Sequence, residues 1–198
     1  MWNYRLGSLL NFADDDDDSD YFTGNSRVDV INILSGTSEY RDVVNKIHAT
    51  LNVTIKKVVK IDNHLLKIYY DQNKELYRQT LNGAFEERDL FHATAQRNVA
   101  SIATYNLDKN RTVRSKFGKG VSFSPSAHYA NTYCNRNVGL NRALILCKVL
   151  IGKCHVGNYS VLEPLPGYDT TTGNCGKVYV KYKDNEFYPK YVAYYNSY

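Results

Sequence analysis

Cysteine is scarce in this sequence and irregularly spaced. The four cysteines, at positions 134, 147, 154 and 175 of 198, are too few for a disulfide framework in a chain of this length, so we expect reduced thiols. None has a flanking motif that marks a nucleophile. Neither C-x-x-C nor H-x-x-x-H occurs. A zinc site of ordinary spacing is therefore not expected, and no metal cofactor is predicted.

Long hydrophobic runs are also lacking. The longest apolar stretch lies within 143–151 and is interrupted by Lys148. It is far shorter than the ~20 residues that a membrane-spanning helix needs. Residues 1–10 lack the continuous apolar core of a secretory signal. We therefore expect an intracellular protein without a membrane partner, and the sequence gives no information on its oligomeric state.

Charge is unevenly distributed along the chain. Six acidic residues fall within the first 20 positions, whereas the rest holds 24 basic and 14 acidic residues, a net charge of +10. We predict that 1–27 is an acidic, disordered segment and that 28–198 is one domain; the acidic run could alternatively screen the basic body. A basic body suits an anionic ligand such as a dinucleotide, a nucleic acid or an acidic protein.

Hydrophobic periodicity predicts helices at 38–51, 63–77 and 95–105. Thr37 and Asn63 lie among the polar residues that could cap the first two, and the apolar face of the second is formed by Leu65, Leu66, Tyr69, Tyr70 and Leu76. Alternation predicts a strand at 53–61, with Val53, Ile55, Val59 and Ile61 on one face. Later apolar segments predict strands of one sheet at 89–92, 120–123, 142–151, 177–182 and 191–195. The fold class is α+β.

A polar loop at 106–119 separates two of these segments. Loops of this length are often functional. It contains Arg111 and Arg114, which could lie near an anionic ligand or simply be solvated charges.

Two motifs carry a family resemblance. The first is Leu90-Phe91-His92-Ala93-Thr94, and the second is Phe117-Gly118-Lys119-Gly120-Val121-Ser122-Phe123, followed by a helix that ends in Tyr133. In order and spacing they resemble the poly(ADP-ribose) polymerase catalytic domain, and the C-terminal segment around 178–192 resembles its mono-ADP-ribosyltransferase branch. The resemblance covers roughly residues 28–198. It implies the ADP-ribosyltransferase fold, a split mixed and antiparallel β-sheet core with flanking helices.

The resemblance also implies a reaction and a site. The co-substrate would be NAD, with no metal, and ADP-ribose would pass to a protein or nucleic-acid acceptor as nicotinamide leaves. His92 matches the histidine that donates to a ribose hydroxyl, and Tyr133 matches the ring that stacks on nicotinamide. The implied NAD-binding residues are His92, Ala93, Thr94, Ser122, Phe123, Ala130 and Tyr133. Without the motifs, His92 and Tyr133 would be read as ordinary structural residues.

Four departures from the family pattern concern the donor site. Ala93 replaces a glycine whose backbone binds the nicotinamide carboxamide, and its methyl group could crowd the ring. Ser122 replaces a tyrosine wall, and Ala130 replaces a serine that hydrogen-bonds the carboxamide. The last two together remove about 1–3 kcal/mol of binding. Val178 replaces the glutamate of the catalytic triad, here His92, Ser122 and Val178, which argues against a chain-elongating polymerase.

Two functions are compatible with these departures. The chain is either a mono-ADP-ribosyltransferase or a catalytically inactive relative that acts as an interaction, ADP-ribose-binding or NAD-binding module. An unrelated chemistry on the same fold is a third alternative.

Overall fold

The computed structural model describes residues 28–112, 116–134 and 140–196. The acidic segment 1–27 and Arg114 lie outside this part of the chain. The helices are α1 (Ser38–His48), α2 (His64–Thr80), α3 (Val99–Tyr105) and α4 (Ala127–Thr132), with short 3-10 turns at Gln96–Asn98 and Lys109–Arg111. The strands are β1 (Val28–Asn32), β2 (Ile55–Asn63), β3 (Glu86–Ala95), β4 (Val121–Phe123), β5 (Asn141–Ile151), β6 (Cys154–Val156), β7 (Thr170–Gly173), β8 (Val178–Lys181) and β9 (Phe187–Asn196). The α+β class is confirmed.

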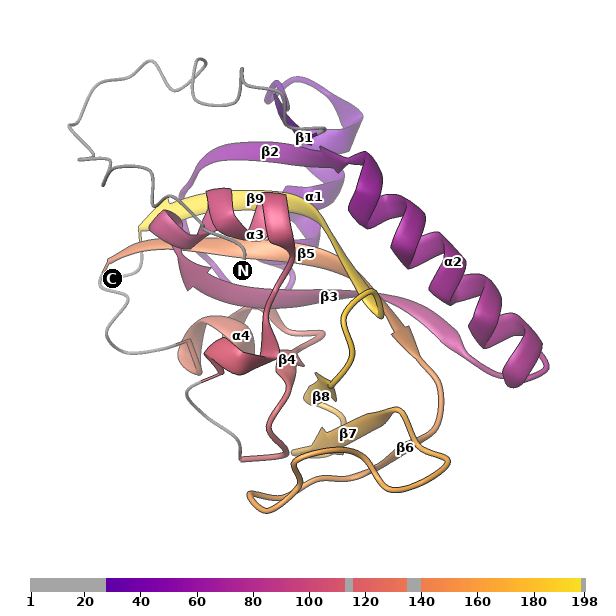
Figure 1. Ribbon diagram of the computed structural model, residues 1–198. Helices are drawn as coiled ribbons and strands as arrows, with labels where there is room; N and C mark the ends of the chain where they lie inside the picture. Colours follow the sequence, from indigo (N-terminus) through magenta and orange to yellow (C-terminus); the bar gives the residue numbers. More distant parts are fainter. Residues whose placement is uncertain (1–27, 113–115, 135–139, 197–198) are drawn as a thin grey trace, which may run out of the picture.

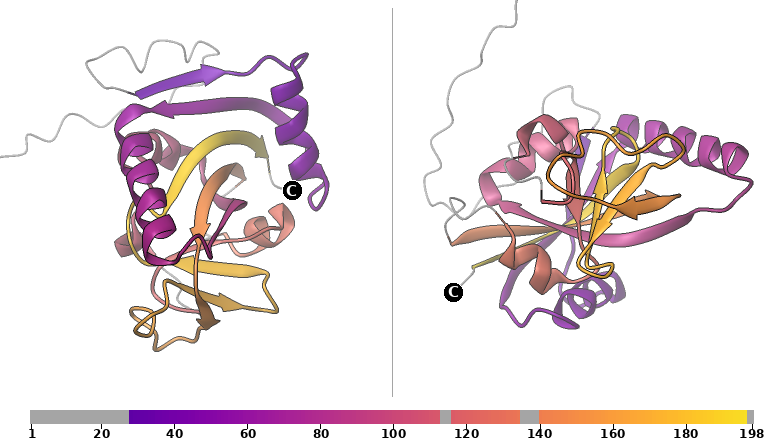
Figure 2. Two further views of the ribbon diagram at one scale, coloured as in Figure 1. Left: turned by 90° about the vertical axis from the view of Figure 1, so that its right-hand side faces the viewer. Right: turned by 90° about the horizontal axis from the view of Figure 1, so that it is seen from below.

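The strands form two sheets rather than the single sheet that we expected from apolar segments. The larger has the order β1-β2-β9-β5-β3, and the smaller β4-β8-β7-β6. All pairs are antiparallel except β6 and β7. Figures 1 and 2 show β1 and β2 at one end of the molecule and the smaller sheet at the other. This divided sheet is the split core that the family resemblance implies.

Helices cover both faces of the larger sheet. The apolar residues of α3, such as Val99 and Ile102, join one core cluster, and those of α1, Val43 and Ile47, join the other. Alternate residues of β5 enter the two clusters, as Leu144 and Ile145 illustrate. This explains why residues 143–151 are apolar apart from Lys148, since a strand buried on both faces has no polar side. Figure 1 shows α3 in front of the sheet and α1 behind it.

The predicted single apolar face of β2 is wrong because the strand contains an irregularity. The β2–β9 register shifts between Ile55 and Lys57, which matches a β-bulge. A bulge shifts the alternation of side chains by one residue. Val59 therefore packs in the α3-side cluster, whereas Ile55 packs on the α1-side cluster with Val58.

Helix capping follows the sequence prediction, but the buried face of α2 does not. The Thr37 hydroxyl accepts a 3.2 Å hydrogen bond from the Tyr40 N–H, and Asn63 Oδ1 accepts one of 3.1 Å from the Leu66 N–H. The residues of α2 that are buried or packed in its core cluster are Leu66, Tyr70 and Tyr77, whereas Leu65, Tyr69 and Leu76 are exposed. Tyr70 and Tyr77 can lie on the buried face because their hydroxyls have hydrogen-bond partners. They donate to Glu87 and Glu186, respectively.

A buried ion-pair network ties α2 to the smaller sheet. The ammonium group of Lys181, which is fully buried, lies 2.7 Å from an Asp169 oxygen and 3.3 Å from a Glu186 oxygen. It also donates a 2.9 Å hydrogen bond to Thr170 Oγ1, and Tyr77 donates to Glu186. Burial raises the pKa of Glu186 despite the nearby ammonium. One buried cation therefore stabilises two carboxylates.

We predict that Lys181→Met destabilises the domain by about 3–5 kcal/mol, because it leaves Glu186 and Asp169 without their cation. Urea unfolding measures the loss. The matched control is Lys109→Met, which breaks the more exposed pair with Glu163 and should cost at most about 1 kcal/mol. Equal losses in the two variants would contradict this account.

Candidate active site

The two sheets meet at one backbone bridge, between Phe91 of β3 and Ser124 just after β4. The Phe91 N–H donates to the Ser124 carbonyl at 2.7 Å, and the Ser124 N–H donates to the Phe91 carbonyl at 2.9 Å. In a continuing antiparallel ladder the next hydrogen-bonded pair would be Ala93 with Ser122. The strands separate instead, and the Ser122 carbonyl lies 3.0 Å from Nδ1 of His92. The sheet splits at the residues of the two motifs.

This separation exposes hydrogen-bonding groups of Ala93. By the two-residue alternation of the ladder, its N–H and C=O point toward the same open edge as those of Phe91. These are the groups that the family resemblance assigns to the nicotinamide carboxamide. The Ala93 methyl group, which we expected to crowd the ring, packs instead against buried core clusters, beside Ala95 and Cys134.

His92 is half-buried and is held in one tautomer. Burial lowers its pKa below the ordinary value of 6.5, and the hydrogen bond to the Ser122 carbonyl opposes this only in part, so the ring is neutral at pH 7. A carbonyl can only accept, so the single proton is on Nδ1 and Nε2 is an acceptor. This reverses the expected direction of the ribose contact, because Nε2 would accept a hydrogen bond from a hydroxyl.

Other residues predicted for the site divide between surface and core. Ser122 is exposed and pairs with Val180 of β8. Phe123 is buried in the core, with its ring edge-on to His92 at a centroid distance of 6.1 Å, so it positions the imidazole rather than lining an open surface. The Thr94 hydroxyl, also buried, accepts a 2.9 Å hydrogen bond from Asn98.

The remaining predicted residues lie on α4 and β8. Ala130 packs against the α1-side core cluster and Tyr133 is 50% exposed. Val178 is buried in an apolar cluster with Val180 and Tyr182. The triad positions are thus near the junction of the sheets, but only His92 among them carries an ionisable side chain.

Glycines of the second motif allow β4 to approach β8 closely. A Cβ on Gly120 would lie 2.3 Å from the Lys181 carbonyl oxygen. Gly118 has a φ of +126°, and a Cβ there would lie 1.7 Å from the Tyr182 hydroxyl. Both positions therefore exclude a side chain and let β4 lie close to β8.

Sequence reasoning missed Tyr129, which packs against the Val178 cluster and stacks on Tyr133. The spacing of four residues between Tyr129 and Tyr133 could have predicted their contact, because residues four apart lie on the same face of a helix.

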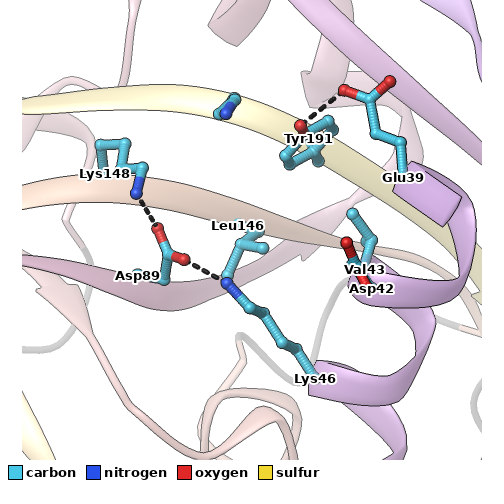
Figure 3. Close-up of a pocket in the computed structure, with 9 residues that line it drawn as sticks. Glu39, Asp42, Val43, Lys46, Asp89, Leu146, Lys148 and Tyr191 are labelled. Carbon is cyan, nitrogen blue, oxygen red and sulfur yellow. Dashed lines mark hydrogen bonds and ion pairs between the residues drawn. The ribbon is translucent and has the colours of Figure 1, made fainter.

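Sequence reasoning also missed a cavity of about 230 Å³ between α1 and the larger sheet. Figure 3 shows Asp89 there between Lys46 and Lys148, and Tyr191 donating to Glu39. Burial alone would raise the pKa of Asp89. The two ammonium groups have the larger combined effect, so the pKa lies below its ordinary value. Asp89 and His92 face opposite sides of β3, so this cavity is separate from the candidate active site.

Within the described ranges, no group of three or more histidines, cysteines and acidic residues is arranged to hold a metal ion. In the same part of the chain no helix is long and apolar enough to cross a membrane. The four cysteines, all within the described residues, form no disulfide bond; Cys134 and Cys147 are buried, and Cys154 and Cys175 are exposed.

The split sheet, the motif histidine and the close glycines together define an ADP-ribosyltransferase domain. A model of the poly(ADP-ribose) polymerase catalytic domain matches residues 37–175, and the chain belongs to this family. Domains of the family use NAD as co-substrate.

Curated relatives include human protein mono-ADP-ribosyltransferase PARP12, which is 27% identical over 180 residues, covering 84% of this chain and 26% of the human protein. A probable poly [ADP-ribose] polymerase of Dictyostelium discoideum is 25% identical over 181 residues, covering 87% of this chain and 54% of that protein. The chain spans about a quarter of the length of the human and mouse PARP12 proteins.

We predict that nitrogen-15 NMR of the ligand-free domain finds Nδ1 of His92 protonated and Nε2 unprotonated at pH 7, with a titration midpoint below 6.5. Because the pKa of His92 is lower in the folded domain, its imidazole binds a proton more tightly in the unfolded state. The free energy of unfolding therefore decreases as the pH falls below 6.5. A protonated Nε2 in the neutral ring would refute the tautomer assignment, and a midpoint above 6.5 would refute the lowered pKa.

Proposed function

We propose that this domain is a mono-ADP-ribosyltransferase that transfers one ADP-ribose unit from NAD to an acidic side chain of a protein. The carrying observation is the junction of the sheets, where a neutral His92 with an accepting Nε2 lies beside the free backbone edge of Ala93. A ribose hydroxyl and a carboxamide are the two parts of NAD that these groups fit. We propose that one domain, 28–198, contains the whole site.

The reaction breaks the bond between the nicotinamide nitrogen and the ribose carbon, and the electron pair leaves with nicotinamide. An acceptor oxygen then bonds to that carbon. Val178 and its apolar cluster can neither take a proton nor stabilise the positive charge that develops on the ribose. A carboxylate acceptor is already deprotonated and negatively charged, so it needs no base and supplies the missing charge itself. The triad His92, Ser122 and Val178 is then suited to a single transfer rather than to chain elongation.

The basic body supports the same acceptor class. Beyond position 20 the chain has a net charge of +10, which steers acidic protein surfaces toward it. The relatives named as mono-ADP-ribosyltransferases support transfer of single units. The proposal also includes an intracellular setting, and nucleic acid as a second acceptor class.

A second candidate is a domain that binds NAD or ADP-ribose without turnover. It is favoured by the loss of polar or aromatic groups at Ser122, Ala130 and Val178, and by the exposed, incomplete wall at Ser122. Binding without transfer would distinguish it from the first candidate.

The test is transfer of label from adenine-labelled NAD to the purified domain or to lysate proteins, with mass spectrometry of the modified side chains. We expect single ADP-ribose units on Asp or Glu, and about a tenfold or greater loss of transfer in His92→Ala, because the donor loses an orienting contact. The control His64→Ala changes an exposed histidine at the start of α2 and should transfer normally.

Each outcome of the transfer assay is informative. Chains of ADP-ribose would refute single transfer, and label unaffected by His92→Ala would refute the site. Absent transfer with retained NAD binding would favour the second candidate.

A further inference from the structure

Tyr129 and Tyr133 form an aromatic stack on one face of α4. Their ring centroids are 4.3 Å apart, with an angle of 33° between the planes. The Tyr129 ring also packs against the cluster of Val178, Val180 and Tyr182 in the smaller sheet. Tyr129 is half-buried, while Tyr133 is more exposed. The Tyr129 ring therefore contacts both Tyr133 and the smaller sheet.

A hydrogen bond tethers Tyr129 to the smaller sheet. Asn174 Nδ2 donates to the Tyr129 hydroxyl from the turn between β7 and β8. The turn is tight, with positive φ values at Asn174, Cys175 and Gly176, and its Lys177 N–H donates to the Asn174 carbonyl at 3.2 Å. Because α4 packs on β3, the tether crosses the junction between the sheets.

The Tyr129 ring contacts Tyr133, one expected wall of the nicotinamide site, and packs on the cluster that holds Val180, the strand partner of the other expected wall, Ser122. The family resemblance gives that site two walls, Tyr133 and the residue at Ser122. Ser122 pairs with Val180, which belongs to the cluster under Tyr129. A planar ring held between two others needs their centroids roughly 7 Å apart, twice the ~3.5 Å of carbon contact. At 4.3 Å the space between Tyr129 and Tyr133 holds no third ring.

We infer that the Tyr129 side chain occupies the nicotinamide subsite of the free domain, so that NAD binds after this ring leaves Tyr133 and breaks its hydrogen bond with Asn174. The inference rests on the proposed function, since it concerns the same donor site. The small side chain of Ser122 is consistent with it, because it replaces the bulky tyrosine wall of the family pattern. The apparent affinity for NAD is then reduced by the fraction of molecules in which the subsite is open.

Calorimetric titration with NAD tests this inference on the unsubstituted chain and four variants. If the closed state predominates about tenfold, Tyr129→Ala lowers the Kd for NAD by about tenfold. Tyr129→Leu keeps apolar contact with the Val178 cluster and should give a similar gain even if alanine loosens the fold. Asn174→Ala, which cuts only the tether, should give a smaller gain. The control Tyr159→Ala removes a tyrosine that is 71% exposed and should leave the Kd unchanged.

Titration with ADP-ribose shows whether the effect belongs to the nicotinamide ring. ADP-ribose lacks that ring, so its Kd should be the same for the unsubstituted chain and both Tyr129 variants. An equal gain for ADP-ribose would overturn the inference.

The remaining outcomes separate this inference from the proposed function. An unchanged or raised Kd for NAD in both Tyr129 variants would overturn only the role of Tyr129, leaving the donor site intact. Absence of NAD binding in the unsubstituted chain and in folded Tyr129→Leu would overturn both, because emptying the subsite would then create no site.

Discussion

The candidate site depends on one backbone bridge, between Phe91 and Ser124. It holds β4 against the edge of β3 and then ends, so the next pair, Ala93 and Ser122, cannot form. The backbone groups of Ser122 and Ala93, which the split leaves without each other as partners, then shape the candidate site. The Ser122 carbonyl fixes the tautomer of His92, and the Ala93 backbone is left facing an open edge. A continuous sheet would have satisfied all of these groups internally and left none for a ligand.

Two further interactions maintain this split. The close approach of Gly120 to β8 sets β4 in place, and the buried Lys181 network binds the smaller sheet to α2. Tyr129 spans the gap on the remaining side through Asn174. In this arrangement Ser122, Ala130 and Val178 replace the polar and aromatic groups of the family pattern. A tyrosine from the next helix fills part of the space, which links the altered pocket to the control of NAD binding.

Much of the fold could be predicted from local sequence, whereas the site could be only partly predicted. Caps at Thr37 and Asn63 depend on neighbours within three residues, and both predictions are confirmed. The β2 irregularity, the tyrosine-lined face of α2 and the short strands β1, β6 and β7 depend on distant partners, so periodicity failed there. Motif order located His92, but its tautomer and the tether of Tyr129 depend on residues 30 and 45 positions away.

Titration of nitrogen-15-labelled domain with NAD, observed at His92, tests the central claim most directly. The account predicts that the unprotonated Nε2 resonance shifts with a saturable dependence on NAD as it accepts a hydrogen bond, while Nδ1 stays protonated against the Ser122 carbonyl. Resonances of both nitrogens that do not change at saturating NAD would contradict the account, because His92 would then lie outside the donor site.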